Sequence, residues 1–128
     1  MKERATIICL QHGRVLLVER GRARWSLPGG TIRRNESVVE AAKRELVEET
    51  TLVVDDLEFQ FQFQFGGLNK RHYVFITELL DNAKPKPSNE ILRCRWFRPR
   101  KVSTLATSVP TREIVELVFG EHVLSPQL

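Results

Sequence analysis

The sequence has only two cysteines and one methionine among 128 residues, and it has no long hydrophobic run. Cys9 and Cys94 lie far apart, and neither Cys-x-x-Cys nor a Cys/His ligand spacing accompanies them. This pattern excludes a disulfide framework and a structural zinc site, and it predicts two reduced, buried thiols. No stretch reaches the ~20 apolar residues of a transmembrane helix, and "ATIICL" is too short for the core of a signal peptide. We therefore expect a cytoplasmic protein without a membrane partner.

The length and composition are those of one soluble domain. Hydrophobic residues make up 41% and charged residues 28% of the sequence, and a chain of 128 residues can enclose a hydrophobic core. The sequence shows neither an internal repeat nor a linker, so we expect a single domain over residues 1–128.

Charge is unevenly distributed along the chain, although its sum is only +4. Six arginines fall between positions 14 and 34, and eight of the sixteen acidic residues fall between positions 36 and 58. A basic block followed by an acidic block favours a site for a metal and a phosphorylated small molecule over a simple DNA-binding face.

The hydrophobic pattern predicts strands before and after one central helix. Ser37 and Glu40 have the spacing of a capping box, which predicts a helix that starts after Ser37 and includes Thr50. The stretch "LEFQFQFQF" alternates strictly and predicts a strand whose phenylalanines share one core-facing side, and Gly120 is expected to end the last helix. These elements predict an α/β sandwich with a mixed sheet, with strands at 5–10, 14–20, 57–65, 72–80 and 90–97 and helices at 38–50 and 110–120.

Three glutamates, Glu45, Glu48 and Glu49, share one face of the predicted central helix. This face borders the apolar stripe of the helix, so the carboxylates lose some hydration. Like charges at this spacing repel each other by about 0.2–0.5 kcal/mol per pair, and partial burial weakens the screening. A divalent cation would offset this repulsion, and magnesium prefers such oxygen ligands. A solvated helix face with ordinary surface glutamates is the alternative interpretation.

The residues around these glutamates resemble the Nudix box, G-x5-E-x7-R-E-U-x-E-E-x-G-U, in which U is aliphatic. The stretch "LPGG" precedes the box, and the matching residues are Gly30, Glu36, Arg44, Glu45, Leu46, Glu48, Glu49 and Leu52. The resemblance implies a Nudix-type α/β/α sandwich with a mixed central sheet. It also implies a hydrolase that cleaves a nucleoside diphosphate linked to another group X, with Mg²⁺ or Mn²⁺ as cofactor.

Thr51 departs from this pattern, because the family has glycine at that position. Glycine supplies a left-handed turn after the helix, whereas a β-branched threonine adopts positive φ poorly. The sequence leaves open whether the helix ends differently or the turn is strained. Because the departure removes no carboxylate, the catalytic interpretation stands.

The resemblance implies roles for single residues of the box. Glu48, Glu49 and the backbone carbonyl of Gly30 are expected metal ligands. Glu45 is expected to be a further ligand or the base that deprotonates the attacking water. Arg44 is expected to orient the glutamates through ion pairs, including one with Glu36.

Glu90 is the best match to the acidic residue that family members often add from a later loop. It is therefore a candidate metal ligand or base, and the choice of the base between Glu45 and Glu90 stays open. An exposed loop glutamate without a role in catalysis is the alternative interpretation for Glu90.

Substrate-binding residues are harder to identify from the sequence. The arginines near the box can hold outer phosphates, and the candidates are Arg24, Arg33 and Arg34. Aromatic residues that can stack on a nucleobase are Trp25, Phe65, Tyr73 and Trp96. A solvated loop charge is the alternative for each arginine, and core packing is the alternative for each aromatic residue.

The substrate is assigned by elimination. Position 67, sixteen residues after Thr51, is glycine, whereas proline or tyrosine near there marks the ADP-ribose or dinucleoside polyphosphate branches of the family. We therefore expect a MutT-like enzyme acting on nucleoside triphosphates. Nucleotide sugars, ADP-ribose and RNA 5′-pyrophosphate are alternative substrates, and a nucleotide sensor without hydrolysis is an alternative function. We expect no nucleic-acid partner other than an RNA 5′ end, and a homodimer stays open.

Overall fold

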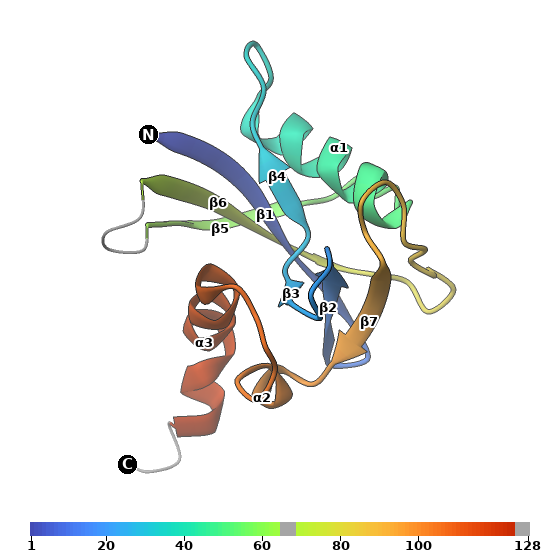
Figure 1. Cartoon of the computed structure of the whole chain (residues 1–128), viewed down its shortest axis with the longest axis vertical. Coiled ribbons are helices and arrows are strands. Elements are labelled where there is room, and N and C mark those ends of the chain that lie inside the picture. Colours follow the sequence, from blue (N-terminus) through green and yellow to red (C-terminus); the bar gives the residue numbers. More distant parts are fainter. Residues whose placement is uncertain (65–68, 125–128) are drawn as a thin grey trace.

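The structure is a computed structural model that describes residues 1–64 and 69–124, without the side chains of residues 121–124. Its sheet is built around two long strands, β1 (Lys2–Gln11) and β6 (Lys70–Glu78), which pair in parallel. The other pairings are antiparallel, and the strand order is β3-β2-β1-β6-β5, with β4 on β1 and β7 on β2 (Figure 1). The remaining strands are β2 (Arg14–Glu19), β3 (Trp25–Ser26), β4 (Gly29–Thr31), β5 (Glu58–Phe63) and β7 (Arg93–Phe97).

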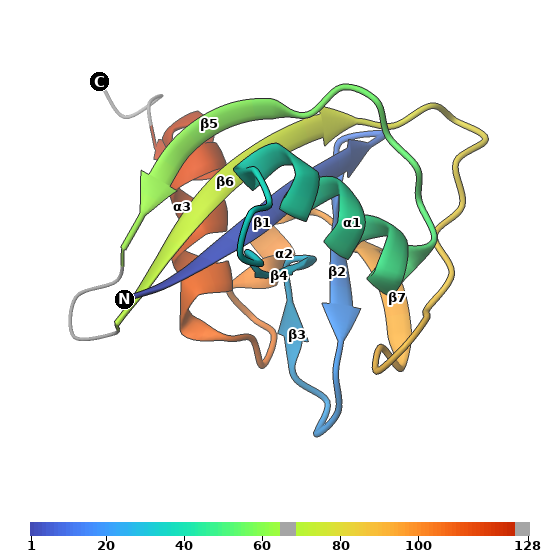
Figure 2. The same cartoon turned by 90° about the horizontal axis from the view of Figure 1, so that it is seen from above.

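Helices cover both faces of this sheet. Figure 2 shows α1 (Val38–Thr50) on one face and α3 (Val109–Leu124) on the other, and the short α2 (Pro99–Val102) precedes α3. Successive residues of β1 point to opposite faces, so Ile7 packs in the α1-side core and Ile8 in the α3-side core. The predicted α/β sandwich with a mixed sheet is confirmed, whereas α2 was not predicted.

The predicted limits of the central helix are confirmed. The Ser37 hydroxyl accepts a hydrogen bond from the Glu40 amide at 3.1 Å, and the Glu40 carboxylate accepts one from the Ser37 amide at 2.8 Å. At the other end Thr51 is left-handed, with φ of 63°, and its amide donates to the carbonyl of Val47. The left-handed turn for which the family uses glycine is thus formed here by a threonine, at a conformational cost of about 1–2 kcal/mol.

The phenylalanines of β5 do not all share one face, so that prediction was wrong. Phe59 pairs with Phe75, whose ring lies in the α1-side core, whereas Phe61 pairs with Val74 of the α3-side core. An irregularity in register between Phe59 and Phe61 inserts one extra residue, which reverses the side-chain alternation. Phe59 is consequently 50% exposed on the opposite side of the sheet from Phe61. Phe65 lies outside the described residues.

Two smaller predictions are corrected by the structure. Gly120 does not end the last helix, because α3 continues through it to Leu124. Both cysteines are free thiols, as predicted, but only Cys9 is buried and Cys94 is half-buried. Burial raises the pKa of Cys9 to about 12 and that of Cys94 to about 11, so both thiols are protonated at neutral pH. Within the described part of the chain, no helix has both the length and the apolarity needed to cross a membrane.

Candidate active site

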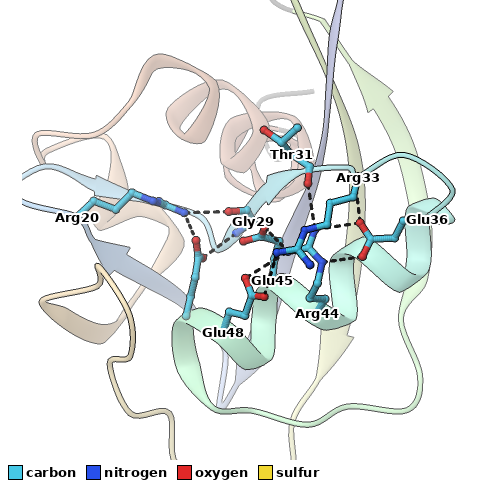
Figure 3. A network of polar contacts seen from close by, with 9 residues as sticks. Arg20, Gly29, Thr31, Arg33, Glu36, Arg44, Glu45 and Glu48 are labelled. Atoms are coloured by element: carbon cyan, nitrogen blue, oxygen red, sulfur yellow. Dashed lines mark hydrogen bonds and ion pairs between the residues drawn. The ribbon is translucent and has the colours of Figure 1, made fainter.

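Glycines on β4 bring the helix α1 close to the sheet. A side chain at Gly29, which has φ of 153°, would collide with the carbonyl oxygen of Ala5 on β1. The carboxylate of Glu45 lies over Gly30, where a Cβ atom would stand 2.5 Å from each of its oxygens. Because these positions lack side chains, the glutamates of α1 can reach across the β4 edge of the sheet (Figure 3).

Arg44 joins three of the predicted site carboxylates (Figure 3). Its Nε and Nη2 atoms donate to Glu36 at 2.6 and 2.9 Å, and its Nη1 atom donates to Glu45 at 2.8 Å and to Glu48 at 3.2 Å. The hydrogen bonds from Arg44 lower the pKa of Glu36 to about 2 and raise the pKa of Arg44. Both groups are therefore charged at neutral pH, and Arg44 fixes Glu45 and Glu48 beside each other.

Glu49 is the most buried of the site glutamates, at 6% exposure. Its carboxylate accepts a hydrogen bond from the Gly29 amide at 3.0 Å and forms an ion pair with Arg20. Arg20 also donates to the Gly29 carbonyl at 2.9 Å, so it ties β4 to the end of α1. Burial, and secondarily the charge of Glu45, raise the pKa of Glu49, while Arg20 opposes this shift. The site thus holds a carboxylate whose charge needs a nearby cation.

The chemistry of this donor set fits a hard divalent cation. Glu45 and Glu48 share one nitrogen of Arg44, Glu49 follows in the same helix face, and Gly30 lies beneath Glu45. All the available ligand atoms are oxygens, which Mg²⁺ and Mn²⁺ prefer. Among the described residues, no group of three or more Asp, Glu, His or Cys side chains is arranged to hold a metal ion. The site carboxylates instead form ion pairs with Arg44 and Arg20. A bound cation would take over part of the charge compensation that these arginines now provide.

Three further residues predicted from the sequence, Glu90, Arg33 and Arg34, have exposed side chains and are less closely connected to the site glutamates. Glu90 is exposed in the loop before β7, and within residues 1–64 and 69–124 no hydrogen bond or ion pair connects it to the glutamates. The same loop does reach α1, because the Ser88 amide donates to the Glu49 carbonyl at 3.1 Å. Arg33 lies 3.6 Å from Glu48 with a largely exposed side chain, and Arg34 is exposed.

A pocket of about 450 Å³ lies next to the glutamates, and we call it the basic pocket. It carries five Arg or Lys side chains and no Asp or Glu side chain among its described lining residues. Arg20 connects it to Glu49, and Arg24 is the one sequence-predicted residue in it. Its polar and charged lining includes Arg4, Thr6, Arg20, Arg22, Arg24, Lys70 and His72.

Sequence reasoning missed most of this pocket. Its signal is a set of polar residues at alternate positions of two strands, Arg4 and Thr6 on β1 and Lys70 and His72 on β6. Such residues point to one face of the sheet, and the parallel register pairs Arg4 with His72. The register could not be read from the sequence, so the four side chains could not be brought together.

The aromatic residues proposed for base stacking lie elsewhere. The Trp25 ring is buried edge-on against Phe97 at 5.1 Å, and Trp96 packs against the α1-side core. Tyr73 also packs on the α1 side, and its hydroxyl donates to Glu3 at 2.9 Å. Of these three residues none lines the basic pocket. Phe65 is not among the described residues.

Comparisons with known proteins agree with this architecture. Residues 1–118 match the family model of the NUDIX domain. Phosphatase NudJ of Escherichia coli K12 is 32% identical over an alignment of 110 positions, and the alignment covers 79% of this chain and 72% of the relative. A nudix hydrolase family member from Chromobacterium violaceum superposes with a TM-score of 0.79 at 28% identity, covering 92% of this chain and 76% of that one. A MutT NUDIX hydrolase from Burkholderia pseudomallei gives 0.78 at 22% identity over 90% and 95% of the chains, which bears on the fold alone.

The fold and the glutamate-bearing helix beside the glycines of β4 define a hydrolase that acts on phosphoanhydrides. The chain belongs to the Nudix hydrolase family. The family resemblance drawn from the box is thereby confirmed.

Proposed function

We propose that the protein is a Mg²⁺- or Mn²⁺-dependent pyrophosphohydrolase that cleaves a phosphoanhydride of a nucleoside diphosphate linked to X. Nucleoside triphosphates are the first substrates in this proposal. The supporting observation is that Arg20 contacts Glu49 on one side and lines the basic pocket on the other. A substrate with its phosphates in the pocket would therefore extend toward the glutamates.

In this proposal Glu45, Glu48, Glu49 and the carbonyl of Gly30 hold the cation. When bound, the cation neutralises phosphate oxygens and makes a water molecule more acidic. Arg44 positions Glu45 and Glu48 through its hydrogen bonds, and this keeps two like charges side by side without substrate.

The remaining residues bind the substrate and take up the proton in this proposal. Arginines of the basic pocket bind the non-reacting phosphates, because guanidinium groups match phosphate geometry. Glu45 or Glu90 accepts the proton of the attacking water. Glu90, being exposed, would have to approach through movement of its loop.

Release of phosphate and pyrophosphate tests the proposal directly. The panel contains nucleoside triphosphates, nucleotide sugars, ADP-ribose, dinucleoside polyphosphates and a 5′-triphosphorylated RNA, each with and without Mg²⁺. We expect turnover that requires the cation, with nucleoside triphosphates as the best substrates. Tight nucleotide binding without turnover would instead identify a sensor, and a strong preference for the RNA would identify an RNA 5′-pyrophosphohydrolase.

A further inference from the structure

His72 has a buried nitrogen that points to a ligand. The ring lies on β6 at 7% exposure and lines the basic pocket. Its Nδ1 atom lies 2.8 Å from the hydroxyl of Thr6, but its Nε2 atom has no hydrogen-bond partner among residues 1–64 and 69–124. Buried polar atoms are normally paired, so an unpaired one in a pocket wall indicates the position of a missing partner.

His72 presents a hydrogen-bond donor to the pocket. Burial, together with the smaller effect of the charges of Arg4 and Lys70, lowers the pKa of His72 to about 4, so the ring is neutral at pH 7. The Thr6 hydroxyl has no other acceptor in the described part of the chain, so it donates to Nδ1 and leaves the ring proton on Nε2. The partner of Nε2 must therefore be an acceptor.

The charged groups of the basic pocket also require a hydrogen-bond acceptor. Its guanidinium and ammonium groups only donate hydrogen bonds, and they come from Arg4, Arg20, Arg22, Arg24 and Lys70. Apart from the imidazole, no aromatic ring lines the described wall of the pocket, so a neutral nucleobase would find no stacking surface there. An anionic group with several acceptor oxygens satisfies both the charge and the donors.

We propose that the basic pocket binds a terminal phosphate group that lies outside the scissile diphosphate, with Lys70, Arg24 and Nε2 of His72 as its contacts. This inference rests on the proposed function, which assigns the scissile diphosphate to the glutamates, and it names the substrate class more narrowly. The phosphate can be the γ-phosphate of a nucleoside triphosphate or a phosphate ester on a ribose. Both sources offer the same terminal oxygens to the pocket.

Calorimetric titration in the presence of EDTA tests this proposal without turnover. The ligands form pairs that differ by one terminal phosphate: ATP and ADP, NADP⁺ and NAD⁺, and coenzyme A and dephospho-coenzyme A. We expect at least one phosphorylated member to bind about tenfold more tightly than its partner, as one charged hydrogen bond allows. A preference in the first pair alone identifies the γ-phosphate, and a preference in the other pairs identifies a ribose phosphate.

Two sets of variants assign the preference to the pocket. Lys70→Gln removes an exposed cation of the pocket, and Lys101→Gln makes the same change on exposed α2 outside it. We expect the first variant to lose most of the preference and the second to retain it. His72→Asn keeps a polar atom near Thr6 but cannot reach the Nε2 position, whereas His72→Gln places an amide there. The Asn variant should lose the preference and the Gln variant should regain part of it.

Two results would overturn the proposal. One is equal affinity within all three pairs for the wild-type protein, and the other is an unchanged preference in Lys70→Gln. Since Lys70 is exposed, that variant remains informative even if thermal melts show that the His72 variants fail to fold. Turnover assays with Mg²⁺ separate the two proposals: absence of any turnover contradicts the pyrophosphohydrolase function, while the affinity ratios still decide the role of the pocket.

Discussion

The carboxylate of Glu45 lies over the α carbon of Gly30, so close that a Cβ atom on residue 30 would stand 2.5 Å from both carboxylate oxygens. Carbon and oxygen atoms do not approach this closely without a bond. Glu45 therefore keeps its position only while residue 30 is glycine. This contact connects the helix α1 to the strand β4, which are separated in the sequence by the loop that contains Glu36.

Gly30→Ala is expected to reduce metal-dependent turnover by about 10- to 100-fold, because Glu45 is a proposed metal ligand and the loss of a contact that supports a metal ligand commonly has an effect of this size. The free energy of unfolding should change little, since the group that moves is the end of a flexible side chain. Steady-state kinetics and a thermal melt measure the two quantities.

Gly120→Ala is the matched control for this variant. A Cβ atom at Gly120 would stand 2.6 Å from a carboxylate oxygen of Glu116, which is exposed on α3. The same displacement of a glutamate thus occurs away from the site, and turnover should remain at the wild-type level. Equal losses in both variants would contradict the importance of the Glu45 position.

Glu49→Gln is expected to abolish Mg²⁺-dependent turnover, with a loss of about a hundredfold or more. The amide retains the shape of the side chain and an acceptor for the Gly29 amide, but it removes the charge. Because burial raises the pKa of Glu49, the neutral variant should be at least as stable as the wild type without metal. Glu58→Gln, on an exposed position of β5, is the control, and near-normal activity of the Glu49 variant would refute a metal-binding role.

The ion pair between Arg44 and Glu36 predicts how stability depends on pH. Hydrogen bonds from Arg44 lower the pKa of Glu36 from 4.5 to about 2, so the pair stabilises the folded state above pH 4.5. This contribution is lost as the pH falls from 4.5 toward 2, where the folded carboxylate takes up its proton. Denaturation of the wild type and Glu36→Gln across this range should show a difference in unfolding free energy that shrinks with falling pH. A difference independent of pH would contradict the pairing.

Thr51→Gly is expected to raise the free energy of unfolding by about 0.5–1 kcal/mol. The left-handed backbone at Thr51 is strained for a β-branched residue, and glycine relieves this strain at a smaller entropic cost. Thr51 is exposed, so the substitution removes little packing. Chemical denaturation measures the change, and a lower stability of the variant would show that the threonine has a favourable role in the turn.

Glu90→Gln is expected to reduce kcat at least tenfold, as general-base or ligand roles require. Exposure of Glu90 makes the substitution harmless to folding, so the thermal melt should be unchanged. A wild-type rate would leave Glu45 as the base and Glu90 as an ordinary loop residue.

Local signals made part of the site predictable. The capping box at Ser37 and Glu40 fixed the start of α1, and the i,i+4 spacing placed Glu48 beside Arg44. Such relationships involve residues within a few turns of each other, so the geometry of a helix is sufficient to derive them. The contact between Arg44 and Glu36 followed from the family pattern and is present in the structure.

The register of the strands could not be predicted from the sequence. The alternation in β5 predicted one face for Phe59 and Phe61, but one inserted residue in the pairing with β6 turned them to opposite sides. Alternation shows which residues share a face only while the register is regular, and a shift of one residue inverts it.

The sequence by itself determined the family, the helix and its carboxylates, because these depend on short spacings along one segment. Only the tertiary structure decided that Arg20 pairs with Glu49 and that Arg4 lies beside His72. The two partners are 29 positions apart in the first pair and 68 positions apart in the second. The parallel pairing of β1 with β6 brings the second pair together. The physical reason is that long-range register is set by the packing of the whole sheet between two helical layers, which no local pattern encodes.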